Sequence, residues 1–196
     1  MKTPQKINLV LLVFIALLTS FSNKLFAQEY HLSNAKSELT VYGTSSLHDW
    51  HIVTEDQKGS LVIEKTQELA IKKMNIEAVS ESLKSGKRSM DKNTYKSLNT
   101  DRYKTITFQF IETKSSTKLD NKNYKVEIYG NLTITGVTKK VSLNFNLALA
   151  ENEIHLTGEK ALKLTDFDIE PPKALFGTIT TGDDITIKFN TILKHK

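Results

Sequence analysis

The stretch "YKVEIYGNLTIT" (124–135) carries the pattern on which the fold prediction rests. Apolar residues alternate along it with polar ones. Successive side chains of a β-strand point to opposite faces, so this alternation predicts a strand with one apolar face and one solvated face. The apolar face is formed by Val126, Ile128, Leu132 and Ile134, and the solvated face by Lys125, Glu127, Asn131 and Thr133.

Other segments repeat this alternation along most of the chain. The clearest are "TITFQFIE" (105–112), "VSLNFNLAL" (141–149) and "DDITIKFNTIL" (183–193), and weaker ones are "ELTVYG" (38–43), "GSLVIE" (59–64) and "IKKMNIEAVS" (71–80). Turn-forming residues stand between them as "DNKN" (120–123), "TG" (135–136), "EN" (151–152) and "TGDD" (181–184). Many one-sided strands at short intervals predict a single all-β domain, either a sandwich or a barrel.

One segment lacks strand alternation. "RSMDKNTYKSLNT" (88–100) offers Ser89 as a helix N-cap and Asp91 near the positive end of a helix. We therefore expect one short helix near residues 89–99.

The first 27 residues have the composition of a secretory signal peptide. Lys2 and Lys6 precede the apolar run "INLVLLVFIALL" (7–18), which is shorter than the roughly 20 residues that a membrane-spanning helix needs. We expect cleavage after Ala27 and a mature domain of residues 28–196 that is exported, to the periplasm or the medium, and does not span the membrane.

The charge of the mature domain argues against nucleic acid as a partner. Removal of residues 1–27 takes away three lysines and no acid, so the formal net charge falls from +5 to +2. The chain has no cysteine, so the hydrophobic core must hold the exported fold without disulfides.

"SSLHDWH" (45–51) is the first candidate for chemistry. On a strand, His48 and His51 would face opposite ways, whereas zinc needs three or four converging ligands. Ser46, His48 and Asp49 are too close along the chain to form a proton relay. We therefore favour Trp50 as a core anchor with His48 as its hydrogen-bonded neighbour, and keep open a ligand contact at a barrel mouth and a metal centre.

Two other polar groups invite a functional interpretation. Asp166, Asp168 and Glu170 would share one face of a strand, but calcium needs six to eight oxygens gathered by a turn, so a solvated face or a turn is favoured, with Phe167 and Ile169 inward. The basic stretch "KSGKRSMDKNTYK" (84–96) is either an exposed loop or an anion cradle at a helix N-terminus.

Several motifs together resemble the YceI-like family. They are "GTSSLHDWHI" (43–52), "SMDKNTYKSLNTDRYKTITFQF" (89–110), "GNLTITGVTKKVSLNF" (130–145), "LTDFDIEPP" (164–172) and "GDDITIKFNTIL" (182–193). The resemblance implies an extended, lipocalin-like antiparallel β-barrel of about eight strands. It also implies a periplasmic or secreted binding protein without catalytic residues, cofactor or metal, which holds a polyisoprenoid or similar long-chain lipid in an apolar tunnel.

The tunnel expected from these patterns is lined by Leu39, Val41, Trp50, Phe108, Phe110, Leu132, Phe145, Leu147 and Phe189. The candidates for head-group contacts are His48, Arg88, Lys92 and Tyr95. The alternative is a filled barrel that serves as a structural or protein-interaction module of the cell envelope, and pairing of two barrels into a homodimer stays open.

Overall fold

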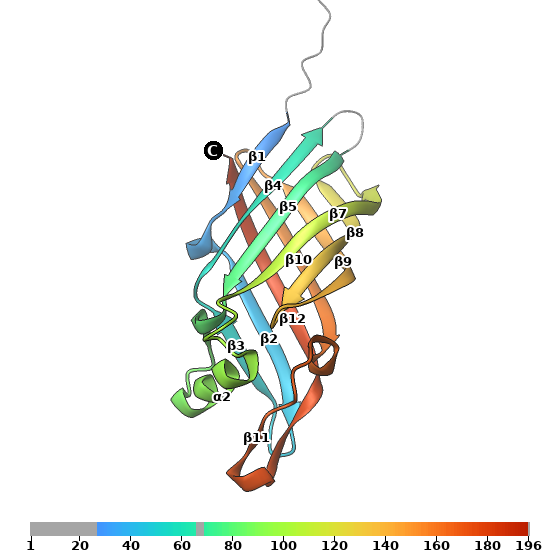
Figure 1. Ribbon diagram of the computed structural model, residues 1–196. Coiled ribbons are helices and arrows are strands. Elements are labelled where there is room, and N and C mark those ends of the chain that lie inside the picture. Colours follow the sequence, from blue (N-terminus) through green and yellow to red (C-terminus); the bar gives the residue numbers. More distant parts are fainter. Residues whose placement is uncertain (1–26, 66–68, 196) are drawn as a thin grey trace, which may run out of the picture.

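The computed structural model describes residues 27–65 and 69–195, which form one closed antiparallel barrel with a helix near one end (Figure 1). The expected signal peptide and its cleavage site after Ala27 lie outside or at the edge of this range. The strands are β1 (Gln28–Leu32), β2 (Glu38–Ser45), β3 (Trp50–Thr54), β4 (Gln57–Lys65), β5 (Leu69–Val79), β6 (Leu83–Lys84), β7 (Thr105–Lys118), β8 (Asn123–Ile134), β9 (Val137–Leu149), β10 (Glu153–Lys163), β11 (Lys173–Ala174) and β12 (Ile179–His195). The helical segments are η1 (Asn34–Lys36), η2 (Ser80–Ser82), α2 (Arg88–Leu98), η3 (Leu164–Phe167) and η4 (Leu175–Gly177).

Eight strands close the ring in the order β1-β4-β5-β7-β8-β9-β10-β12, with β12 returning to β1. This confirms the barrel that the family resemblance implied. The predicted strands of residues 38–43, 59–64 and 71–80 are also confirmed as parts of β2, β4 and β5, except that Ser80 begins η2. The inward faces follow the alternation, since Val126, Ile128 and Ile134 are buried on β8.

β12 changes its partner along its length, which makes the two ends of the barrel different. Its last residues pair with β1, for example Leu193 with Leu32. Further back, Asn190 to Thr181 pair with β2, whose other edge continues to β3 and β6. Only the end nearer the C-terminus is therefore closed by the ring of eight, and α2 lies near the opposite end (Figure 1).

The segment "TGDD" does not form the predicted turn. Residues 181–184 lie within β12, where the register with β2 shifts between Thr181 and Ile185. Such a bulge lets the long strand bend without ending. Asp183 accepts hydrogen bonds from the Thr165 amide at 2.9 Å and the Thr165 hydroxyl at 2.8 Å, so the bulge also holds η3 in place.

"LTDFDIEPP" forms a turn rather than a strand. Leu164–Phe167 is a 3-10 helix, and Asp168 follows with a positive φ of 56°. Phe167 and Ile169 are buried as expected, at 1 % and 4 % exposure. The prediction of a turn is thus confirmed. The expectation that the three acids share one face of a strand is wrong, because this segment is not a strand.

The predicted helix is present as α2, but its N-cap is wrong. Lys87, and not Ser89, occupies the N-cap position, and it makes no capping hydrogen bond through its side chain. Asp91 instead accepts hydrogen bonds from the Ser85 amide and hydroxyl at 2.7 and 2.6 Å. These contacts tie the first turn to the chain that precedes it. None of the helices in the described ranges has the length and apolar character to cross a membrane.

Candidate functional site: an apolar cavity at the α2 end

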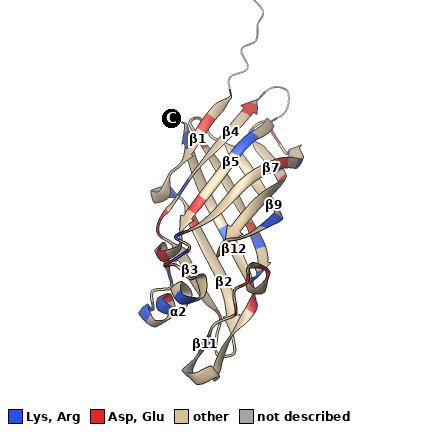
Figure 2. Ribbon diagram, viewed as in Figure 1, with Lys and Arg blue, Asp and Glu red and all other residues tan. Residues whose placement is uncertain are grey.

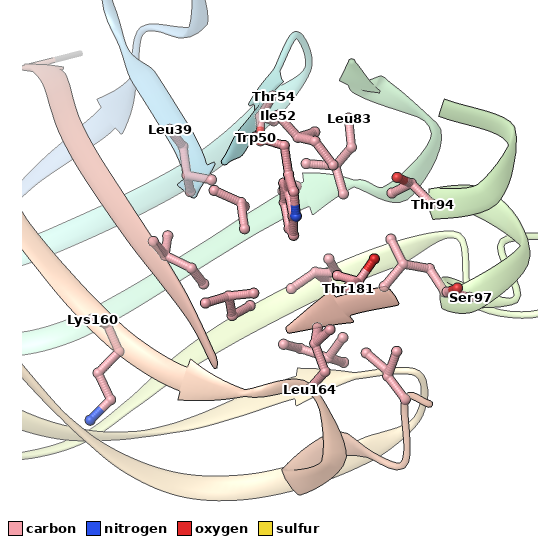
Figure 3. Close-up of a pocket in the computed structure, with 18 of the residues that line it drawn as sticks. Leu39, Trp50, Ile52, Thr54, Leu83, Thr94, Ser97, Lys160, Leu164 and Thr181 are labelled. Atoms are coloured by element: carbon pink, nitrogen blue, oxygen red, sulfur yellow. The ribbon is translucent and has the colours of Figure 1, made fainter. Parts of the chain in front are cut away.

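The interior of the barrel is filled at one end and hollow at the other. At the end closed by β1, core side chains such as Leu61, Ile128 and Ile154 have no exposed surface. Toward α2 the inward side chains surround a cavity of about 420 Å³ (Figure 3). This volume lies within the range of pockets that hold small molecules.

The wall of this cavity consists mainly of aliphatic and aromatic side chains from the inward faces of the strands. Among them are Ile52 and Leu83 near the helix and Leu143 and Ile187 on the barrel wall. The Thr54 hydroxyl also faces this space, is buried, and has no hydrogen-bond partner among the described residues. The cavity therefore suits a long apolar molecule that carries few polar groups.

Seven of the nine residues expected along the tunnel line this cavity. They are Leu39, Val41, Trp50, Phe108, Leu132, Phe145 and Phe189. Phe110 and Leu147 do not: Leu147 belongs to the filled core and is 1 % exposed, and Phe110 is half-buried and packs against that core. Alternation identified their inward face correctly, but it carries no information on how far along the barrel axis a residue lies.

Glycines let two aromatic rings lie flat against the wall. A Cβ atom at Gly43 would come within 2.2 Å of the Trp50 ring, which lies across from it on β3. A Cβ atom at Gly130 would come equally close to the ring of Phe108. Larger residues at either position would push the rings away from the wall, so these glycines keep the cavity open.

Trp50 is half-buried, packs against the core beside the cavity, and has a different hydrogen-bond partner from the one expected. Its Nε1 donates a hydrogen bond to the Thr44 carbonyl at 2.9 Å. His48 does not bond to Trp50. Its Nδ1 lies 2.8 Å from the Asp49 carbonyl oxygen, and its exposed side chain lines the cavity.

One face of α2 covers the cavity. Its lining residues are Met90, Asn93, Thr94, Ser97 and Leu98, together with Ser89 at the start of the helix. Most of them recur at three- and four-residue intervals, which place side chains on the same side of a helix. The sequence contains this spacing, but a prediction based on charged residues does not identify it, because Asn, Thr and Ser are neutral.

The head-group candidates on α2, which are Arg88, Lys92 and Tyr95, are absent from the cavity lining. The Tyr95 hydroxyl lies 2.9 Å from the Glu81 carbonyl oxygen and accepts a hydrogen bond from Lys84, which raises the pKa of that lysine. Tyr95 therefore fastens α2 to η2 and β6.

The cavity opens at the end of the barrel near α2. Its lining includes the exposed residues Leu47, Lys87 and Lys173, which we call the mouth. The charged residues that line the cavity are the lysines at positions 87, 160 and 173, and no Asp or Glu of the described residues lines it. Lys160 takes an inward position on β10 between Gly158 and Leu162 (Figure 3).

The histidines do not assemble a metal centre with the acids. Within residues 27–65 and 69–195, no group of three His, Asp or Glu side chains is placed to hold a metal ion. His51 lies outward on β3, where its ring is 6.1 Å from that of Tyr42.

Comparisons with known proteins agree with this architecture. The YceI-like domain family matches residues 30–193. No curated protein sequence matches the chain. A similar solved structure is a polyisoprenoid-binding domain from Saccharophagus degradans implicated in plant cell wall breakdown. Its TM-score is 0.67 at 14 % identity, over 85 % of this chain and 98 % of that one.

Two further structures share the fold. BcnA from Burkholderia cenocepacia has a TM-score of 0.66 at 15 % identity, over 82 % of this chain and 98 % of that one. The Campylobacter jejuni YceI protein has a TM-score of 0.55 at 21 % identity, over 73 % and 83 %. At these identities the structures show a common fold, and the sequence match establishes the relationship. The chain belongs to the YceI-like domain family.

Proposed function

We propose that the protein is an exported, non-enzymatic carrier of a long-chain lipid, with a polyisoprenoid as the first ligand to test. The observation that carries this proposal is the apolar cavity of about 420 Å³ that ends at an exposed mouth. The description of the Saccharophagus degradans domain as polyisoprenoid-binding supports the ligand class. The basic and apolar composition of residues 1–27 supports export.

The apolar wall supplies enough free energy for this role. Each buried CH₂ group contributes about 0.8 kcal/mol, and a chain of several isoprene units can offset association costs estimated at about 4–15 kcal/mol. Binding of this kind requires no precise polar constellation, so the selection among lipids would depend on chain length and width.

The polar end of the ligand would lie beside α2. Asn93, Ser97 and His48 bring hydrogen-bonding groups to the cavity, and Lys87 stands at its mouth. Arg88, Lys92 and Tyr95 do not line the cavity, so we no longer place them in contact with the head group. A fully filled barrel acting as an interaction module is less well supported, since only one end is filled.

The first test is denaturing extraction followed by mass spectrometry of protein purified from an exporting host. We expect a stoichiometric long-chain lipid. Trp50 is the only tryptophan and lines the cavity, so a polyprenol added to delipidated protein should change its fluorescence. A folded protein that yields no lipid, and whose fluorescence responds to neither polyprenol nor fatty acid, would contradict the proposal.

A further inference from the structure

Two loops with exposed apolar side chains lie next to each other at the mouth. The turn between β2 and β3 carries Leu47, which is 67 % exposed, and the tip between β11 and β12 carries Phe176, which is fully exposed. Hydrogen bonds join the turn to the start of β12, directly after the tip. The Ser46 amide donates to the Thr180 carbonyl at 2.9 Å, and the Thr180 amide donates to the Ser46 hydroxyl at 3.1 Å.

The packing of the domain does not explain why a phenylalanine occupies position 176. Its side chain buries no surface, and its backbone has a φ of 55°, in the left-handed region that a bulky residue disfavours. An exposed aromatic residue held in a disfavoured conformation points to a contact outside the domain.

The same end of the barrel carries basic residues that are not paired with acids. Residues 84–96 contain five Lys and Arg against one Asp, and Figure 2 shows basic positions along α2. Across the described ranges, the ion pairs do not include Lys87, Arg88 or Lys92. All three are exposed. Their charge is therefore available to an anionic partner.

The apolar loops and the cavity are continuous. Leu47 both projects from the surface and lines the cavity, and Lys87 does the same on the side of α2. A molecule that enters or leaves the cavity through the mouth would pass between these two residues. The chemistry of the cavity wall therefore indicates a lipid surface, rather than a protein, as the partner of this end.

We propose that the α2 end docks on an anionic lipid bilayer, with Leu47 and Phe176 in the interfacial layer and Lys87, Arg88 and Lys92 at the phospholipid head groups. Aromatic side chains favour this layer, and each nearby Lys or Arg strengthens attraction to anionic lipid. This inference rests on the proposed carrier function. Docking by the mouth would let a lipid move between bilayer and cavity without crossing water.

The test is flotation of the purified protein with vesicles of phosphatidylcholine, with or without phosphatidylglycerol. We expect binding to the anionic vesicles that weakens as salt is raised. Phe176→Ser should reduce this binding by about tenfold, the effect of removing one large apolar side chain from the membrane. Arg88→Glu combined with Lys92→Glu should reduce it at least as much.

The matched control is Leu119→Ser. Leu119 is 60 % exposed in the turn after β7, at the filled end of the barrel, so its replacement should leave vesicle binding unchanged. All variants share the same N-terminal region, so any membrane contact made there is common to them. Phe176 does not line the cavity, so Phe176→Ser should still retain lipid by mass spectrometry.

Two results would overturn the docking proposal. One is absence of binding to anionic vesicles by the unaltered protein, and the other is binding that Phe176→Ser and the charge reversals leave intact. If lipid is still extracted in either case, the carrier function stands and only the docking surface is wrong. If no lipid is extracted, the carrier function fails as well, whatever the vesicles show.

Discussion

At the end closed by β1, inward side chains such as Leu147 and Ile154 are almost fully buried, whereas near α2 the inward Val141 and Leu143 are half-buried and line a cavity. The strands at both ends have the same alternation, and β9 contributes to both. The two ends differ because the ring of eight strands closes at only one of them. An eight-stranded ring is just wide enough for side chains to fill, and it is complete only where β12 pairs with β1.

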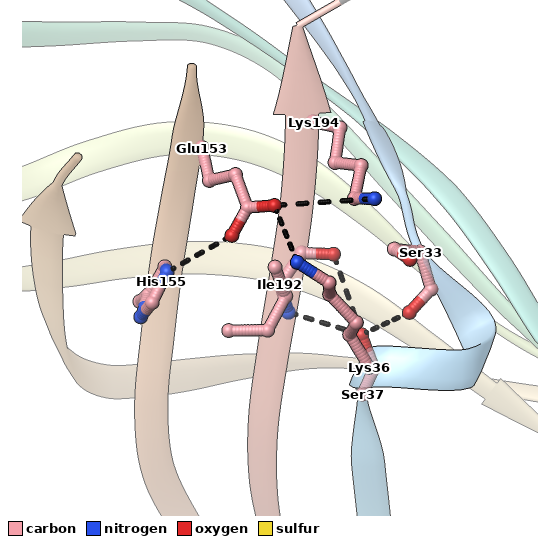
Figure 4. Close-up of polar contacts among 7 residues, drawn as sticks. All are labelled: Ser33, Lys36, Ser37, Glu153, His155, Ile192 and Lys194. Atoms are coloured by element: carbon pink, nitrogen blue, oxygen red, sulfur yellow. Dashed lines mark hydrogen bonds and ion pairs between the residues drawn. The ribbon is translucent and has the colours of Figure 1, made fainter. Parts of the chain in front are cut away.

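Basic side chains at the filled end are paired with an acid, whereas three basic side chains near α2 are not. At the filled end Glu153 accepts a hydrogen bond from Lys36 at 2.8 Å and lies 4.0 Å from Lys194 (Figure 4). Nearby, the Ser37 hydroxyl accepts a hydrogen bond from the Ile192 amide at 3.0 Å and so links the end of η1 to β12. At the α2 end, Lys87, Arg88 and Lys92 are exposed and lie outside such pairs. Ion pairs occur at this end too, as between Lys173 and Glu170 at 3.6 Å, but Lys87, Arg88 and Lys92 take no part in them.

The largest expected effect comes from truncating matched leucines on β9. Leu147→Ala should lower the free energy of unfolding by about 2–5 kcal/mol, the usual cost of a cavity in a packed core. Leu143→Ala, four residues away on the same face, should cost clearly less, because that side chain already borders a cavity. Urea unfolding of both variants checks this, and equal losses would show that the two ends are packed alike.

Replacing a valine with phenylalanine should also distinguish the two ends, because only the hollow end has room for a larger side chain. Val126→Phe at the filled end should destabilise the fold by about 1–3 kcal/mol through overpacking. Val141→Phe should be tolerated because the ring can enter the cavity, and it should reduce the amount of extracted lipid. Thermal unfolding and mass spectrometry measure the two outcomes. If Val141→Phe destabilises the fold as much as Val126→Phe does, or leaves the amount of extracted lipid unchanged, the cavity is misplaced.

A smaller effect is expected from Gly43→Ala. The added methyl group would displace the Trp50 ring toward the cavity and lower the affinity for lipid by roughly tenfold, equivalent to about 1.4 kcal/mol. A fluorescence titration of Trp50 measures this change. Tyr42→Ala, on the exposed side of the same strand, is the control and should leave the affinity unaltered.

The smallest effect concerns acid pH at the filled end. The hydrogen bond from Lys36 lowers the pKa of Glu153. A depressed folded-state pKa means that the stabilisation is complete above about pH 4.3, the ordinary Glu pKa, and is lost as the pH falls through the folded-state pKa. Urea midpoints measured across this range should fall less in Glu153→Gln than in the unaltered protein. A matched Glu159→Gln variant that behaves identically would refute the role of Glu153.

Much of the fold could be predicted from local alternation, and its failures have physical reasons. β10 was not recognised because its inward positions include Gly158 and Lys160, which break the apolar pattern. The segment "TGDD" has the residues of a turn, yet its backbone continues as a bulged strand because β2 and β10 pair on either side of it. Pairing between distant segments overrides local turn preference in this case.

The candidate site was predictable only in part. Alternation identified inward residues, of which Phe108 and Phe189 line the cavity and Phe110 and Leu147 do not. The cavity face of α2 was not predicted, because its Asn, Thr and Ser side chains are uncharged, whereas the prediction rested on Arg88, Lys92 and Tyr95.

The sequence by itself determined the all-β character, the faces of most strands and the place of the helix, because side-chain periodicity is a local property of the backbone. The tertiary structure alone decided where the barrel is filled, where it is hollow and which residues form the mouth. Those features depend on the point at which β12 exchanges β2 for β1, and on the position of α2 along the barrel axis. Both are set by contacts between segments far apart in the chain, which no local pattern records.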